Sequence, residues 1–191
     1  MIPKYLDVPV FYGDNELSLV AATEKLDGKQ YVIAKHLGEY HLGDRHGRVT
    51  TAPFVSSILT DSIRKMLRKS PDGTVIYGQL CGPGVSKLTD YGLSHPKFFV
   101  FDISINGVYL GWSDLRRTCR AYSVSTAPLL YLGFLSELRV DRLTSGPTML
   151  ASASEIKGIT VRLGAVIRPT VDGRTDNGTR YQVVNEVFSE L

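Results

Sequence analysis

The 191-residue sequence lacks most of the features that mark specialised protein classes. Its two cysteines, Cys81 and Cys119, do not have the spacing of a metal motif and are too few for a disulfide scaffold. We expect both to be small, buried, hydrophobic side chains. No apolar run is long enough to span a membrane, and the first residues lack the apolar centre of a signal peptide. We therefore expect an intracellular, cytoplasmic protein with no membrane partner.

The sequence also shows no internal repeat, no low-complexity tract and no obvious linker. Hydrophobic residues make up 43% of the chain and charged residues 21%, which is ordinary for a globular protein. The length suits one domain with a sizeable core. We expect a single domain over residues 1–191, with no C-terminal OB-fold or RNA-binding domain after it. The net charge of +3 is compatible with a polyanionic partner but does not require one.

One short stretch, Glu24-Lys25-Leu26-Asp27-Gly28, lies between an apolar segment at residues 17–22 and a strand-like run at 30–34. Asp-Gly between two apolar runs is a strong hairpin signal, which would leave Lys25 exposed. The same stretch also suits a lysine at a strand end that is directed into a pocket. The residues of this stretch alone leave both interpretations open.

Residues 35–48 predict a hairpin that presents Arg45 and Arg48, with a solvated loop as the alternative. The three histidines of this segment are five residues apart, which suits ligands on neither a helix face nor a strand face. We therefore do not favour a zinc site.

Residues 52–69 predict the clearest helix, with one apolar and one strongly basic side. We interpret the basic side as solvent-exposed in preference to an RNA contact. Residues 113–122 predict a second helix, capped by Ser113.

The remaining apolar runs predict a mixed α+β fold with mainly antiparallel strands. The expected strands or buried segments are residues 74–81, 97–105, 108–112, 128–134, 158–163 and 179–185, with a hairpin turn at Asn106-Gly107. Asp102 is the odd residue in an apolar strand. A buried carboxylate needs hydrogen-bond partners, so Asp102 is either a satisfied core acid or part of a site.

Five segments in order resemble the motifs of the covalent nucleotidyltransferases. Their sequences are Lys-Leu-Asp-Gly, Tyr-Gly-Gln-Leu-Cys-Gly, Phe-Val-Phe-Asp-Ile, Lys-Gly-Ile-Thr-Val-Arg and Arg-Tyr-Gln, at residues 25–28, 77–82, 99–103, 157–162 and 180–182. They are most similar to the ATP-dependent RNA ligases of the bacteriophage T4 RNA ligase 2 type, which makes a phage gene a candidate source. The resemblance implies the nucleotidyltransferase fold, with mainly antiparallel sheets and flanking helices.

The resemblance also implies roles for individual residues. Lys25 would attack the α-phosphate of ATP and form a lysyl-AMP adduct, which requires a neutral amine and hence a lowered pKa. Glu24 would offer its backbone to the adenine, and Phe101 would stack on the base. Asp102 would support the site. The other implied nucleotide contacts are Asp27, Gly28, Arg45 or Arg48, Gln79, Lys157, Arg162, Arg180 and Gln182.

Three positions depart from the family pattern. Gln79 and Lys157 stand where the family has glutamates, and Gln182 stands where it has a second lysine. These changes make the site more cationic and less suited to Mg²⁺. Glu155 is a candidate metal ligand in place of the missing acid, and Lys157 could itself supply the charge of the metal.

The departures leave two functions open. The first is an enzyme that charges itself with AMP and joins a 5′-phosphate to a 3′-hydroxyl, using ATP, with GTP not excluded, and Mg²⁺ or Mn²⁺. The second is an impaired relative that binds a nucleotide or an RNA end without ligating it. In both, the expected partners are nucleic-acid ends of the RNA type, and a partner protein could contribute to substrate binding.

Overall fold

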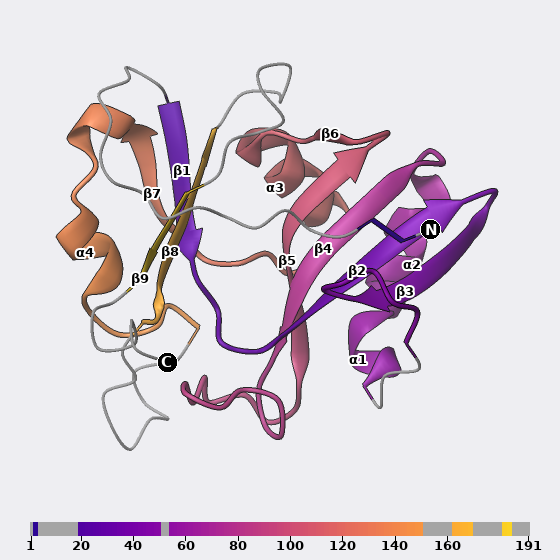
Figure 1. The fold of residues 1–191 in the computed structure, drawn as a ribbon, viewed down its shortest axis with the longest axis horizontal. Coiled ribbons are helices and arrows are strands. Elements are labelled where there is room, and N and C mark those ends of the chain that lie inside the picture. The colour runs from indigo at the N-terminus through magenta and orange to yellow at the C-terminus, as the bar shows by residue number, and fades with distance from the viewer. Residues whose placement is uncertain (1, 4–18, 51–53, 151–161, 170–180, 185–191) are drawn as a thin grey trace.

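The computed structural model describes residues 2–3, 19–50, 54–150, 162–169 and 181–184, which form two antiparallel sheets (Figure 1). The five-stranded sheet has the order β3-β2-β4-β5-β6. Its strands are β2 (Lys29–His36), β3 (Glu39–Asp44), β4 (Thr74–Cys81), β5 (Lys97–Ile105) and β6 (Val108–Tyr109). The four-stranded sheet has the order β7-β1-β8-β9. Its strands are β1 (Leu19–Glu24), β7 (Leu129–Phe134), β8 (Gly164–Pro169) and β9 (Tyr181–Val184). The predicted α+β class with mainly antiparallel sheets is confirmed.

Three helices cover one face of the five-stranded sheet and lie behind it in Figure 1. They are α1 (Val55–Ile58), α2 (Asp61–Lys69) and α3 (Trp112–Ala121). Their apolar sides contribute Ile58, Leu67 and Leu115 to the main core, where they join Ile33 and Ile76 of the sheet. This burial of apolar surface stabilises the sheet. Because the three helices cover this face, the opposite face of the sheet is the one that they leave uncovered.

Two details of the predicted helices were wrong. The single helix expected over 52–69 is broken, because Thr60 is extended and caps α2 by accepting the N–H of Ile63. Ser113 does not cap α3. The cap residue is Gly111, since Trp112 already belongs to the helix and is buried in the core.

The four-stranded sheet packs against α4 (Val140–Thr144), next to a short 3-10 turn (Leu135–Glu137). Leu143 of α4 contacts the buried residues Val20 and Ile167 of the sheet. The segment 128–134 was predicted to be buried, and this was wrong: its residues are half-buried or exposed. Because β7 is an edge strand, Leu132 and Phe134 are 56% and 44% exposed.

The predicted hairpins are present. The turn between β2 and β3 is made by Leu37 and Gly38, both with positive φ, and that between β5 and β6 by Asn106 and Gly107. Positive φ at both central residues gives the twist that hairpin strands need, and Asn and Gly adopt it at low cost. The strand expected at 158–163 lies largely outside the described residues, and the described strand β8 starts just after it. No helix in the described parts of the chain is long and apolar enough to cross a membrane.

Candidate active site at the junction of the two sheets

Lys25 lies where the chain leaves one sheet and enters the other. β1 belongs to the four-stranded sheet and β2 to the five-stranded sheet, so the hairpin interpretation of residues 24–28 was wrong. Backbone hydrogen bonds fix this crossing point: Glu24 N–H donates to Pro128 O (2.8 Å) and Lys25 N–H donates to Gly164 O (2.9 Å). The Lys25 side chain is half-buried. Burial lowers the pKa of the Lys25 amine below its ordinary value of 10.5, which favours the neutral, nucleophilic form.

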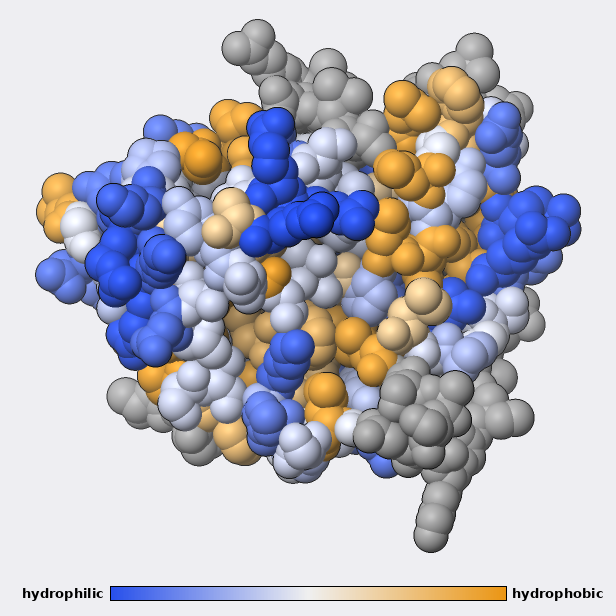
Figure 2. Space-filling model, turned by 180° about the vertical axis from the view of Figure 1, so that it is seen from behind, coloured by the Kyte–Doolittle hydropathy of each residue, from blue (hydrophilic) through white to orange (hydrophobic). Residues whose placement is uncertain are grey.

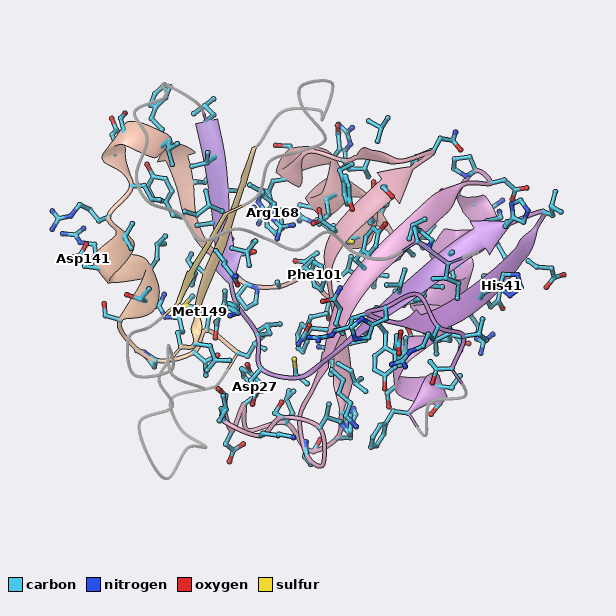
Figure 3. The ribbon with its side chains drawn as sticks, in the orientation of Figure 1. Asp27, His41, Phe101, Asp141, Met149 and Arg168 are labelled. Carbon is cyan, nitrogen blue, oxygen red and sulfur yellow. The ribbon has the colours of Figure 1, made fainter. Side chains whose placement is uncertain are left out.

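Asp27 ties this crossing to the loop that follows β4. Its carboxylate accepts the N–H groups of Lys87 (2.7 Å), Leu88 (2.6 Å) and Thr89 (3.0 Å). The N–H of Asp27 donates to the hydroxyl of Tyr91, a buried side chain. The Asp27 carboxylate therefore positions the loop beside Lys25 (Figure 3). A direct contact between Asp27 and a nucleotide stays a prediction.

Gly28 and Gln79 fix how closely the chain after Lys25 approaches β4 as it enters the five-stranded sheet. A Cβ added to Gly28 would lie 2.1 Å from Leu80 O, so only glycine fits there without a shift of the backbone. The Gln79 side chain donates through Nε2 to Gly28 O (2.8 Å). A glutamate at position 79 could not make this bond, because a carboxylate has no proton to donate. The departure Gln79 thus stabilises the turn after Lys25.

Glu24 is buried, and its carboxylate Oε2 accepts the N–H of Met149 (2.8 Å). Burial raises the pKa of Glu24, and the opposing effects come from the Thr148 hydroxyl, the Met149 N–H and the charge of Arg162. The Glu24 carboxylate thus anchors the segment that contains Thr148 and Met149. Because the Glu24 N–H is already donated to Pro128, it is not available to an adenine.

Arg168 is the site residue that the sequence reasoning missed. It extends from β8 toward Phe101 of β5, and so joins the two sheets next to the predicted adenine platform (Figure 3). Its Nη1 donates to Phe101 O and lies 3.3 Å from Asp102 Oδ1, and its Nη2 donates to Thr23 Oγ1 (3.1 Å). The Arg168 and Asp102 side chains are 2% and 0% exposed. Asp102 is therefore a paired core acid that also supports the strand of Phe101.

Phe101 itself is half-buried and packs against two clusters of the core, and its stacking on an adenine stays a prediction. A signal for Arg168 did exist in the sequence. A positive charge in the apolar run Gly164–Pro169 is as unusual as the negative charge of Asp102 in its strand. Two opposite charges in two apolar strands predict a buried pair.

Arg45 and Arg48 lie in the turn after β3, at the outer edge of the five-stranded sheet. Arg48 makes an ion pair with Asp44 (2.8 Å), and Arg45 Nε donates to His46 Nε2 (3.0 Å). Both side chains are exposed. Their described hydrogen bonds stay within this turn, and their role at a nucleotide stays a prediction.

A sequence model of the RNA ligase family matches residues 18–182. The chain belongs to the RNA ligase family. A search of curated protein sequences gives no significant match.

The solved structures with a similar fold include several of Naegleria gruberi RNA ligase. One variant with ATP and Mn has a TM-score of 0.70 at 16% identity, and the ligase with PPi has a TM-score of 0.70 at 15% identity; each match covers 92% of this chain and 52% of that chain. A further variant without ligand has a TM-score of 0.69 at 14% identity, over 100% of this chain and 60% of that chain. At these identities the likeness shows the fold. The chain spans about half of the ligases that it matches.

The strand beside Lys25 is β8. Its first residue, Gly164, accepts the Lys25 N–H, and the residue before it is the buried Leu163. The segment in which Lys157 stands where the family has a glutamate lies outside the described residues, so its place relative to Lys25 stays a prediction.

The other predicted residues are distributed as follows. Arg162 Nη2 donates to Ser145 O, and its charge acts on Glu24. Gln182 lies on β9 opposite Val166 of β8. Glu155, Lys157 and Arg180 lie outside the described residues.

The described residues do not fit a divalent metal held by the protein. Within them, no group of three or more His, Cys, Asp or Glu side chains is placed to hold a metal ion. The carboxylates of Glu24 and Asp27 already accept backbone N–H groups, and Gln79 offers an amide where the family has an acid. Mg²⁺ binds through carboxylates and substrate phosphates, and this part of the chain supplies few of the former.

Proposed function

We propose that the chain is a nucleotidyltransferase that accepts AMP on Lys25 and passes it to the 5′-phosphate of an RNA end. The observation that carries this proposal is the half-buried Lys25, with its lowered pKa, at the junction between the sheets. The Naegleria gruberi structures contain ATP, AMP with Mn, or PPi, which are the substrate and products expected of such a step.

In the first step the neutral Lys25 amine attacks the α-phosphorus of ATP. A P–N bond forms, the bond from the α-phosphorus to the bridging oxygen breaks, pyrophosphate leaves and the amine loses a proton. Lys25 is positioned for attack by the backbone bonds on either side of it, and Gln79 holds the following turn. Phe101, fixed through Arg168, supplies a face for the adenine.

In the later steps AMP is transferred to a 5′-phosphate, and a 3′-hydroxyl then displaces it to seal the strand. RNA is the proposed substrate because the chain belongs to the RNA ligase family. ATP is the proposed nucleotide, with GTP as the alternative that the experiment tests. A protein partner that presents the RNA end remains part of the proposal.

The test is intact-mass spectrometry after incubation with ATP, or separately with GTP, in the presence of Mg²⁺ or Mn²⁺. We expect a mass gain of one nucleotide that is lost in Lys25→Ala. Lys29→Ala is the matched control, since Lys29 is a neighbouring but exposed lysine and should still allow the adduct. An adduct that survives Lys25→Ala would refute Lys25 as the acceptor.

A second candidate function rests on Gln79 and Lys157, which stand where the family pattern has two glutamates. The chain would then bind a nucleotide or an RNA end without forming the adduct. Calorimetry that detects ATP binding, combined with no mass gain under either metal, would favour this function. The suggestion that Lys157 replaces a metal charge predicts that Lys157→Glu slows adduct formation, and a faster variant would contradict it.

A further inference from the structure

A second feature, separate from the Lys25 site, lies on the helix side of the five-stranded sheet. A groove of about 380 Å³ runs between the C-terminal half of α2 and α3. Its volume is in the range typical of ligand sites. The strand residues at its base include Ile76, Ile103 and Ile105, which lie on the face of the sheet opposite to Tyr77 and Phe101. The groove is therefore on the other side of the sheet from the proposed adenine platform.

The two helices that form the groove have a larger net positive charge than the chain as a whole. Together α2 and α3 contain seven basic and two acidic side chains, a net charge of +5. The whole chain has 22 basic and 19 acidic side chains, so the rest of the chain has a net charge of −2. Such a separation of charge indicates an electrostatic footprint for a polyanion.

Two of these charges, Lys69 of α2 and Arg117 of α3, line the groove from opposite sides. Lys65, Arg68 and Lys69 lie on one exposed face of α2, three and four residues apart, and Lys69 lines the groove. Arg117 lines it from α3 and makes an ion pair with Asp114, while Arg120 is exposed one turn further along. Figure 2, which views the molecule from behind, shows strongly hydrophilic side chains in separate groups on this face, with paler, less polar surface between them.

The chemistry of the groove suits the repeating unit of a polynucleotide. Its base is apolar, and Tyr122 and Thr118 line the α3 side. Phosphates can contact Lys69 and Arg117 at the rims, while a base packs on the apolar floor or on the tyrosine. A solvated helix face needs no such groove, and the groove therefore favours an RNA contact over the solvent-exposed face expected from the sequence.

We propose that the α2–α3 groove binds single-stranded RNA as a contact separate from the Lys25 site. A strand held there would be anchored to the domain while its end reaches the other side of the sheet. This inference goes beyond the proposed function, because RNA binding in the groove does not depend on nucleotide transfer to Lys25.

The test measures the binding of a fluorescent oligouridine to the full chain by anisotropy over a range of salt concentrations. The variant is Lys69→Glu/Arg117→Glu, and the matched control is Arg139→Glu/Arg142→Glu. The control makes the same change of charge on exposed residues near α4, and in each pair one arginine faces an aspartate. Lys25→Ala is measured alongside.

We expect the groove variant to bind the oligouridine about 25-fold more weakly at 0.1 M salt. The slope of the logarithm of the binding constant against the logarithm of the salt concentration should become less steep by about 1.4, because two phosphate contacts are lost and each contributes about 0.7. The control and Lys25→Ala should bind like the natural chain. Equal losses of affinity in the groove variant and the control would overturn the proposal, as would an unchanged affinity of the groove variant. Displacement of the oligouridine by a small excess of uridine monophosphate would also overturn it.

The state of the fold is checked by the melting temperature of each variant. If Lys69→Glu/Arg117→Glu fails to fold, Lys69→Gln/Arg117→Gln replaces it, and the same reduction in salt slope is expected. The nucleotide adduct is measured by mass in the same samples. Because the groove lies away from Lys25, the adduct should be unchanged in the groove variant, so a failure of one proposal is distinguishable from a failure of the other.

Discussion

The buried pair of Asp102 and Arg168 gives the sharpest prediction about stability. The two charges are 3.3 Å apart and almost fully buried, and each comes from a different sheet. At an effective dielectric constant of about 20, charges at this distance attract by about 5 kcal/mol, which offsets the cost of their burial. Removing one partner leaves the other charge uncompensated, at a cost of about 3–5 kcal/mol.

We therefore expect Arg168→Met and Asp102→Asn each to lower the free energy of unfolding by about 3–5 kcal/mol. In a chain of this size this corresponds to a fall in Tm of about 10 °C. Arg168→Met also removes the donors to Phe101 O and Thr23 Oγ1, so its loss should be the larger of the two. The double variant should cost about 2–3 kcal/mol less than the sum of the single variants, because the pair is removed as a unit.

Urea unfolding followed by tryptophan fluorescence measures this cycle directly. Trp112 is the lone tryptophan of the sequence, is 2% exposed, and has its ring centre 5.7 Å from the Arg168 guanidinium carbon. The control is Arg139→Met, which breaks the exposed ion pair with Asp141 and should leave the urea midpoint almost unchanged. Strictly additive losses in the cycle, or single losses no larger than in the control, would refute the reasoning.

Three further predictions concern the crossing and the cysteines. Because burial lowers the pKa of Lys25, the rate of adduct formation should rise with pH and reach its plateau below pH 10.5. Between the lowered pKa and pH 10.5, Lys25 binds fewer protons in the folded chain than in the unfolded chain. The free energy of unfolding should therefore increase as pH rises through this window. A plateau above pH 10.5 in a rate profile measured by mass would contradict the lowered pKa. Gly28→Ala should cost about 1–3 kcal/mol in urea unfolding and slow the adduct, since its Cβ meets backbone atoms of β4. Unchanged stability would show that the chain at residue 28 can move away from β4 at no cost. Cys81 and Cys119 are buried, and burial raises the pKa of the Cys119 thiol to about 12 and that of the Cys81 thiol further still. A thiol reagent should therefore label neither cysteine until the chain is unfolded. Rapid labelling of the native protein would contradict the burial of these thiols.

The apolar patterns and turn residues of the sequence were sufficient to predict most elements. The strands Thr74–Cys81 and Lys97–Ile105 have the predicted bounds, and Asn106-Gly107 forms the predicted turn. The order of the motifs was enough to predict the family. These features are local, because strand propensity and turn chemistry depend on neighbours along the chain.

The break in the predicted helix at Thr60 and the exposure of Leu132 and Phe134 were not predictable in the same way. The break in the helix depends on which residues of the segment pack into the core. The exposure of the two β7 side chains depends on the position of β7 at a sheet edge. Apolar runs do not state which strand will lie next to which, so they cannot distinguish an edge strand from a central one.

At the site, the sequence by itself determined that Lys25 lies at a strand end before an Asp-Gly turn. Only the tertiary structure decided that this turn joins two sheets, that Gly164 accepts the Lys25 N–H, and that Arg168 pairs with Asp102. The physical reason is distance along the chain. These contacts join residues 66 to 139 positions apart, and they form because antiparallel pairing and the burial of charge require partners that no local pattern specifies.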